Sequence, residues 1–423
     1  MIKTTKITEF KDNKKLTSDK SIINYDDPEF IYIPLFDNLG SYKTELNIND
    51  YVNVGEVVAV NEKFNIPIHS SISGFVIDLN KKMWINTGKL VSCIVIKNDY
   101  LNNSIIHKEN INFNKELIVK IIQEKGIVGM GGAGFPTYLK YKNYDNINTL
   151  IVNGCECEPF LTCDYQLMLE ETIKLVNGIH YILNLINGNE AYIVIKEGKK
   201  QLYNVLNNYI DDKIKLVKVK DEYPVGYERY IVNKIMKKDY INYPSEIGCV
   251  VNNVSTIISI YEAMKYNKPV IERIVTITGY CIQKPINVKC KIGTNVSEII
   301  DKICLPKNKY HLKHLTAGGI MTGKSMVSND IVVTKTLNGI IINPYLRKSK
   351  EVYVCIGCGK CANICPMKLT PTQLMHYYNL KQKEELIKLK ANLCIQCGLC
   401  SYICPSRIDL MHFTSKAKEL IKR

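Results

Sequence analysis

The spacing of hydrophobic and polar residues changes near residue 100. Between residues 30 and 98, apolar and polar side chains alternate in short runs, clearest in Tyr51–Val60 and Gly74–Asp78. Alternation with a period of two predicts β-strands, and turn residues such as Asn49-Asp50 separate the runs. The pattern predicts an all-β module of about seventy residues that contains no helix.

After Asn114 the apolar spacing becomes helical. Asn114 can cap a helix that places Leu117, Ile118, Ile121 and Ile122 on one face and that ends at Gly126. Further along, strands are predicted at 147–153, 191–196 and 216–220, and helices at 166–185 and 199–210. Strands that alternate with helices predict an α/β domain.

The last third of the chain has a mixed pattern. We predict a strand at 270–279, a short helix at 295–303 and a charged helix around 374–390. With 423 residues the chain is long enough for several domains. The predicted boundaries are a polar tail at 1–29, the β module at 30–98, the α/β domain at 99–248, a third domain at 249–345 and a C-terminal domain at 346–423.

Half of the 16 cysteines form two matching groups near the C-terminus. Each group reads C-x2-C-x2-C-x3-C-P, beginning at Cys355 and at Cys394. In such pairs three thiolates of one group bind one [4Fe–4S] cluster, and the fourth binds the other cluster. Zinc also binds C-x2-C repeats, but four cysteines twice over, each closed by proline, favour iron and sulfur. The predicted ligand sets are Cys355, Cys358, Cys361 and Cys404 for one cluster, and Cys394, Cys397, Cys400 and Cys365 for the other.

Charge and hydropathy narrow the possible partners. The net charge is +15, from 56 Lys and Arg against 41 Asp and Glu, and it is spread along the chain as lysine. Without an arginine-rich arm or a recognition helix, we expect no nucleic-acid binding, whereas an acidic redox partner such as a ferredoxin would fit the charge. No apolar run is long enough for a membrane span, and Met1–Lys20 lacks an apolar signal core. We therefore expect a cytoplasmic protein.

A glycine-rich loop follows the first predicted helix. Residues 126–137 contain G-x-G-x-x-G, but a Rossmann fingerprint would follow a strand and open a helix, and here a helix precedes it. The glycines can still form a backbone cradle for a phosphate or a flat ring. A merely flexible loop is the alternative.

Several stretches resemble one known family. Gly126–Lys140 resembles the loop shared by the flavin/NADH subunit of respiratory complex I and the RnfC subunit of Rnf electron-transport complexes. The segment Ile66–Gly74 is similar to the lipoyl-like start of RnfC. Further similar stretches, in chain order, are Asn153–Pro159 (N-x-x-E-x-E-P), Tyr223–Glu228 (Y-P-x-G-x-E), Val251–Thr256 (N-N-V-x-T) and Ile274–Gly293 (a β-grasp, or SLBB, module).

The resemblance implies a multidomain α/β fold. Its parts would be a lipoyl-like barrel-sandwich domain, an α/β domain for FMN and NADH, an SLBB β-grasp domain and an α-helical dicluster ferredoxin domain. The cofactors would be FMN, NAD(H) and two [4Fe–4S] clusters, and no side chain would itself be catalytic because the cofactors carry the chemistry. The implied cofactor-binding residues are Gly129, Gly131, Gly132, Gly134, Phe135, Lys140, Asn153, Glu156, Glu158, Glu228, Asn252 and Asn253.

The sequence departs from the family in places that concern its partner. Thr8–Asp12 stands where RnfC proteins usually have G-G-x-H-P, and Asp37–Tyr42 lacks the His and Pro of Q-H-x-G-A-P. Cys155 adds a thiol beside the expected flavin, either as packing or with a redox role. The partner is therefore either the other Rnf subunits, at the cytoplasmic face of the cell membrane, or a soluble reductase of the proline- or cobalamin-reductase type. A flavin-free dicluster adaptor is a third hypothesis.

Overall fold

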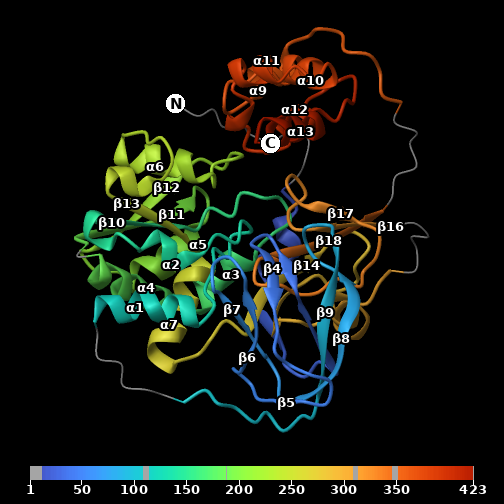
Figure 1. The fold of residues 1–423 in the computed structure, drawn as a ribbon. Coiled ribbons are helices and arrows are strands. Elements are labelled where there is room, and N and C mark those ends of the chain that lie inside the picture. The colour runs from blue at the N-terminus through green and yellow to red at the C-terminus, as the bar shows by residue number, and fades with distance from the viewer. Residues whose placement is uncertain (1–11, 108–113, 187, 308–312, 345–350, 423) are drawn as a thin grey trace.

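A computed structural model describes residues 12–107, 114–186, 188–307, 313–344 and 351–422 of the chain. Of the segment Thr8–Asp12, which differs from the family motif, only Asp12 is among the described residues. Figure 1 shows the C-terminal helices at one end of the molecule, above the α/β domain, with the N-terminal strands lower down. Within the described residues, no helix is both long and apolar enough to cross a bilayer.

The N-terminal module consists of two four-stranded sheets around one core. Its described residues between 30 and 98 form strands and turns without a helix, as predicted. Alternating side chains such as Ile31, Ile33, Ile94 and Ile96 point inward and are fully buried. One sheet has the order β2 (Phe30–Pro34), β9 (Leu90–Asn98), β8 (Gly74–Trp84), β5 (Tyr51–Val52), and the other β3 (Phe36–Asp37), β4 (Gly40–Lys43), β6 (Val57–Asn61), β7 (Pro67–His69).

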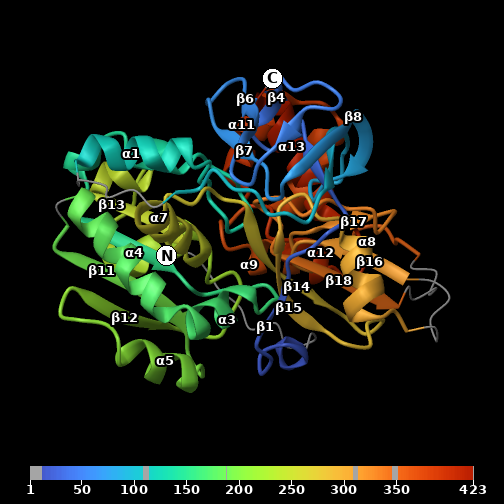
Figure 2. The ribbon, with the colours of Figure 1, turned by 90° about the horizontal axis from the view of Figure 1, so that it is seen from below.

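The α/β domain is built on a four-stranded parallel sheet. Its strand order is β12 (Ile214–Val219), β11 (Glu190–Lys196), β10 (Thr149–Asn153), β13 (Cys249–Asn253). Helices α1 (Lys115–Glu124), α4 (Thr172–Leu185), α5 (Lys200–Asn207) and α7 (Val254–Tyr266) share one core on one face. Helix α6 (Glu228–Met236) packs on the other face. Figure 2 shows α4 and α7 side by side.

Two features of this domain, its C-terminal boundary and its second helix, differ from the sequence-based expectation. Strand β13 and helix α7 follow the boundary expected at 248, yet they complete the α/β domain, because β13 is the fourth strand of its sheet and Val250 and Val251 pair there with Leu150 and Ile151 of β10. The helix expected at 166–185 is two helices, α3 (Cys163–Glu170) and α4. They meet where the Thr172 hydroxyl donates to the Met168 carbonyl, which competes with the helical bonding.

The third domain is a six-stranded mixed sheet. Its order is β1 (Ile22–Tyr25), β15 (Ile286–Lys291), β14 (Glu272–Thr278), β18 (Gly339–Pro344), β16 (Lys313–Ala317), β17 (Lys324–Met326). Strand β1 comes from the segment expected to be a polar tail, and it pairs in parallel with β15 along Ile22–Tyr25. The helix expected at 295–303 is α8 (Val296–Ile299) followed by a π-helical turn, Ile300–Cys304.

The C-terminal domain is helical. It contains α9 (Lys360–Ile364), α10 (Pro371–Asn379), α11 (Lys383–Lys388), α12 (Leu399–Tyr402) and α13 (Leu410–Lys422). The helix expected around 374–390 is interrupted between α10 and α11, where Lys381 adopts a left-handed conformation with φ of 55°.

Close packing of α4 on α7 sets the position of the segment that follows β13. A Cβ added to Gly178 in α4 would lie 2.6 Å from the Ile257 carbonyl oxygen of α7. Gly178→Ala should therefore push the helices apart and cost about 1–3 kcal/mol of stability, which a lower denaturation midpoint would show. Asn177→Ala, at an exposed neighbouring position of α4, is the matched control and should leave the midpoint unchanged or slightly higher.

Candidate functional site

The glycine loop is a closed turn between α1 and α2 (Thr137–Lys140). The Gly129 N–H donates to the Phe135 carbonyl at 2.7 Å, and the Gly134 N–H donates to the Gly129 carbonyl at 3.0 Å. Gly132 and Gly134 have φ of 111° and 71°, values that favour glycine. A Cβ on Gly132 would meet nothing within 4 Å, so the loop faces open space there. The loop is therefore an ordered cradle.

The backbone at the tip of this loop has free donors. Among the described residues, the N–H groups of Gly131, Gly132 and Ala133 have no hydrogen-bond partner. Successive unpaired N–H groups form a concave surface that suits an anion. This arrangement favours a phosphate-binding cradle over the flexible-loop alternative.

Two asparagines lie beside the loop at the carboxyl ends of neighbouring strands. Asn153 ends β10 and Asn253 ends β13, and the two are direct partners in the parallel register. Asn253 lies 3.4 Å from the position of a Cβ on Gly131. Its side chain caps α7 by accepting the Ser255 N–H at 2.9 Å, and it donates to Asp164 at 2.7 Å. The carboxyl edge of a parallel sheet is where open α/β folds bind ligands.

A cluster of buried charged side chains lies next to these strand ends. The Glu156 carboxylate accepts the Asp164 N–H at 2.8 Å and lies 3.7 Å from the Lys14 ammonium. Burial and the negative charge of Glu156 raise the pKa of Asp164, while Arg273 opposes the shift. The sequence pattern does not point to four residues of this region, Asp164, Ser255, Lys14 and Arg273. Lys14 lies in the segment expected to be a tail, and only the three-dimensional packing places it here.

Other residues expected at the site are more dispersed. The Lys140 ammonium donates to the Val251 carbonyl at 2.6 Å and lies 3.9 Å from Glu228, and burial lowers its pKa while Glu228 opposes this. Asn153 donates to the Gly226 carbonyl at 2.8 Å. Phe135 is 38% exposed at the loop. The Asn252 side chain is buried against the Tyr141 hydroxyl, in the core under α2.

Glu158 makes a different contact from the one expected. Its carboxylate accepts the Met321 N–H at 3.0 Å and the Thr322 hydroxyl at 2.6 Å. Both partners belong to the 318–323 turn of the six-stranded sheet domain. Burial raises the pKa of Glu158, and these hydrogen bonds oppose that shift. In this structure Glu158 joins two domains instead of facing the glycine loop.

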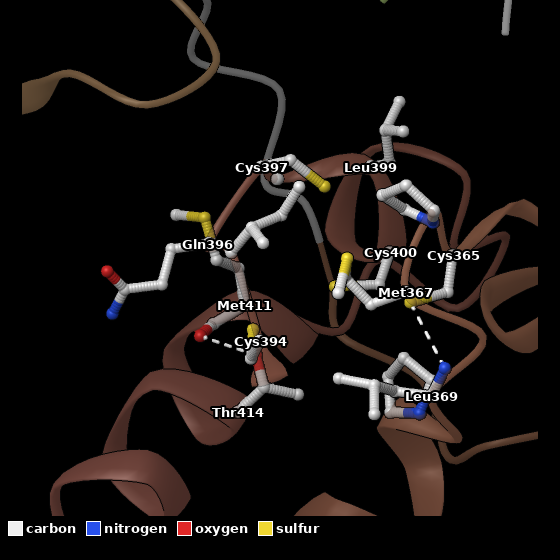
Figure 3. Close-up of a pocket in the computed structure, with 14 residues that line it drawn as sticks. Cys365, Met367, Leu369, Cys394, Gln396, Cys397, Leu399, Cys400, Met411 and Thr414 are labelled. Atoms are coloured by element: carbon white, nitrogen blue, oxygen red, sulfur yellow. Dashed lines mark hydrogen bonds between the residues drawn. The ribbon is translucent and has the colours of Figure 1, made fainter. Parts of the chain in front are cut away.

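Two cavities in the C-terminal domain contain the eight clustered cysteines. Cys365, Cys394, Cys397 and Cys400 line the first, which Figure 3 shows together with Met367 and Leu369. Cys355, Cys358, Cys361 and Cys404 line the second. In each cavity, the fourth thiol comes from the opposite motif. The grouping matches the two ligand sets predicted from the spacing. Among the described residues, no three His, Cys, Asp or Glu side chains form a site for a single metal ion.

The thiol next to the expected flavin site is buried. Cys155 is 2% exposed and lies 3.7 Å from the Val194 carbonyl, and burial raises the pKa of its thiol far above the usual value. A thiol that stays protonated is a poor nucleophile. The position supports the packing interpretation of Cys155.

Comparison with known proteins gives three family models along the chain. A Nuo51 FMN-binding domain matches residues 122–262, an RnfC barrel-sandwich hybrid domain matches 7–100, and a 4Fe-4S dicluster domain matches 354–408. The FMN model includes β13 and most of α7, in agreement with the observed sheet.

Similar whole proteins cover most of the chain. The C component of the proton-translocating ferredoxin:NAD(+) oxidoreductase complex of Clostridium ljungdahlii is 32% identical, over 86% of this chain and 81% of that protein. The chain belongs to the RnfC family. The corresponding component of the Na(+)-translocating complex of Acetobacterium woodii is 30% identical, over 83% and 81%. That of the ion-translocating oxidoreductase complex of Vibrio cholerae is 30% identical over 89% of this chain, which spans 50% of that relative's length.

Among solved structures, NAD+-reducing [NiFe]-hydrogenase in the H2-reduced state gives a TM-score of 0.53 at 15% identity. The match covers 73% of this chain and 63% of that one, and it supports the fold alone. Together the matches make this RnfC-family chain an electron-transfer subunit with an FMN-binding domain and two [4Fe–4S] clusters.

The exchange of the fourth cysteine between motifs can be tested by paired substitutions. Cys365 and Cys397 line the same cavity. Cys365→Ser combined with Cys397→Ser should therefore lose no more iron than either single variant, which is about four of the eight iron atoms per chain. Cys404→Ser combined with Cys397→Ser affects both cavities and should remove nearly all of it. Iron analysis after anaerobic reconstitution measures both results. If the second double variant retained four iron atoms per chain, the fourth cysteine of each motif would not belong to the opposite cluster.

Proposed function

We propose that this chain transfers electrons between NADH and a redox partner, with FMN at the glycine loop and one cluster in each cysteine cavity. When bound, FMN accepts electrons as a pair from NADH and releases them singly to iron–sulfur centres. The residues that would hold it are the free N–H groups of Gly131–Ala133, together with Asn153, Asn253 and Lys140. Phe135 is exposed enough to stack against the nicotinamide or the adenine.

The residues around the loop fit a phosphorylated flavin. Unpaired backbone donors would accommodate the phosphate. Asn153 donates one amide N–H to Gly226 and Asn253 donates one to Asp164, so each has a second amide N–H to offer at the carboxyl edge of the sheet. The Lys140 ammonium supplies positive charge nearby. Asn252, Glu158 and Glu228 contribute less directly, because their observed contacts are with Tyr141, with the 318–323 turn and with Lys140.

The observation that carries the proposal is the contact between the α/β domain and one cysteine loop. The Tyr223 hydroxyl donates to the Cys397 carbonyl at 2.9 Å. Tyr223, Met321 and Leu399 are buried together, with Cys157 and Cys397 packed against them. The cavity of Cys397 is therefore the inner one, whereas Cys355 and Cys358 of the other cavity are exposed. An inner and an outer site suit transfer from a flavin to an external partner.

The family relationship supports one kind of partner. The relatives from Clostridium and Acetobacterium belong to ion-translocating ferredoxin:NAD(+) oxidoreductase complexes, so the other subunits of such a complex are the partners we propose, with a place at the cytoplasmic face of the membrane. A soluble reductase is the second candidate, favoured by the altered Asp37–Tyr42 segment. The basic charge suits an acidic, ferredoxin-like protein in either case.

The test is anaerobic reduction of the reconstituted chain by NADH, with and without FMN. We expect the visible iron–sulfur absorbance to bleach only when both are present. Cys397→Ser should keep FMN reduction by NADH but slow reduction of the remaining outer cluster. The matched variant Cys358→Ser should leave reduction of the inner cluster at the rate of the unmodified chain. If the clusters stayed oxidised in the presence of NADH and added FMN, the electron-transfer proposal would be wrong, and the hypothesis of a dicluster adaptor would be the one supported.

A further inference from the structure

Three backbone carbonyls in the first half of the glycine loop accept hydrogen bonds from side chains of other elements. The Lys335 ammonium donates to the Gly126 carbonyl at 2.7 Å, and the Arg273 guanidinium donates to the Met130 carbonyl at 2.6 Å. Between them, the Thr256 hydroxyl of α7 donates to the Val128 carbonyl at 3.3 Å and accepts the Met130 N–H at 3.0 Å. The loop is thus held from behind, and its free N–H groups follow directly at residues 131–133.

Both cations come from the six-stranded sheet domain, and both are buried. Arg273 in β14 is 2% exposed, and Lys335, just before β18, is 8% exposed. Lys335 also donates to the Pro67 carbonyl of β7 at 2.8 Å, so it joins the barrel-sandwich domain to the start of the loop. Gly126 fits beside it only without a side chain, since a Cβ there would lie 2.4 Å from the Lys335 ammonium.

These cations are costly if their only role is stability. Burial lowers the pKa of Lys335 to about 7, while the charge of Asp37 opposes the shift. A neutral Lys335 amine still has two N–H donors, which are enough for the carbonyls of Gly126 and Pro67. Within the described chain, the Nη1 atom of Arg273 is buried without a hydrogen-bond partner. An unpartnered buried donor is unfavourable, so a well-packed apolar residue would serve the fold alone better.

We propose that Lys335 and Arg273 are positioning residues of the glycine loop, which hold its carbonyls away from the cofactor so that the N–H groups of Gly131–Ala133 face the flavin phosphate. The six-stranded sheet domain then acts as the rear support of the cofactor site. Neither side chain needs to touch FMN. The identity of the ligand, FMN, rests on the proposed function. The hydrogen bonds from Lys335 and Arg273, however, should order the loop even when no flavin is bound.

The first test measures loop order in the flavin-free chain by amide hydrogen exchange. Lys335→Met and Arg273→Lys should speed exchange at Gly129, Met130 and Gly134, whose N–H groups are bonded within the site. Lys20→Met is the control, because Lys20 also donates to a backbone carbonyl, that of Pro285 at 2.9 Å, within the six-stranded sheet domain. The control should leave exchange at these three amides unchanged.

The second test measures FMN affinity by quenching of flavin fluorescence. Each variant should bind FMN about tenfold more weakly, because each loses a hydrogen bond that holds a loop carbonyl, and its iron content should be unchanged. Lys335→Gln, which keeps an uncharged amide NH2 as a donor group, should recover part of the affinity, and it replaces Lys335→Met if that variant does not fold.

Two results would overturn the assignment. Lys335 and Arg273 variants that keep both slow exchange and the original FMN affinity would show that the loop holds its own shape. An equal loss in Lys20→Met would show a general loss of stability instead of loop positioning. If the unmodified chain binds no FMN, the proposed function fails, but the exchange experiment still decides whether the two cations order the loop.

Discussion

Parallel pairing of β10 with β13 is the constraint on which the site depends. It brings Asn153 and Asn253 to the same edge of the sheet, although a hundred residues separate them in the chain. It also fixes the start of α7, from which Thr256 binds the glycine loop and Ser255 binds Asp164. The close contact between Gly178 of α4 and Ile257 of α7 holds that helix against the sheet. A shift of one residue in this register would move Asn253 to the opposite face and away from the loop.

The acidic strand end after β10 shows how one short segment serves two domains. Glu156 stays within the α/β domain, where it binds the Asp164 N–H and faces Lys14. Two residues later, Glu158 leaves it and binds the 318–323 turn. That turn also packs closely against the inner cysteine loop, because a Cβ on Gly398 would lie 2.8 Å from the Met321 carbonyl. The flavin domain, the six-stranded sheet domain and the inner cysteine loop therefore meet around Met321, which explains why an acidic side chain expected at the cofactor serves the assembly of domains.

The sequence was most informative where function depends on local spacing. The two cysteine motifs predicted which thiols lie together in each of the two cavities, because three of the four in each group lie on a single loop. The glycine loop was also visible as a cradle. Sequence reasoning failed for residues whose partners are remote: Arg273 lies 143 residues from Met130, and Lys335 lies 209 from Gly126. It also could not tell that Asn252 points into the core while Asn253 points to the site, because neighbouring strand residues face opposite sides and the pattern does not say which side holds the ligand.

The tip of the barrel-sandwich domain has a fixed place in this arrangement. Its β6–β7 turn accepts hydrogen bonds at the Phe64 carbonyl from Gln123 of α1, at 3.2 Å, and from the Tyr138 hydroxyl of α2, at 3.1 Å. These two helices flank the glycine loop, and Lys335 adds a third connection through Pro67. A turn bound at two points to the flavin domain, with a third contact to the six-stranded sheet domain beside it, cannot act as a swinging arm. Its attachment instead resists separation of α1 from α2, so the barrel-sandwich domain contributes stiffness to the glycine loop between these helices.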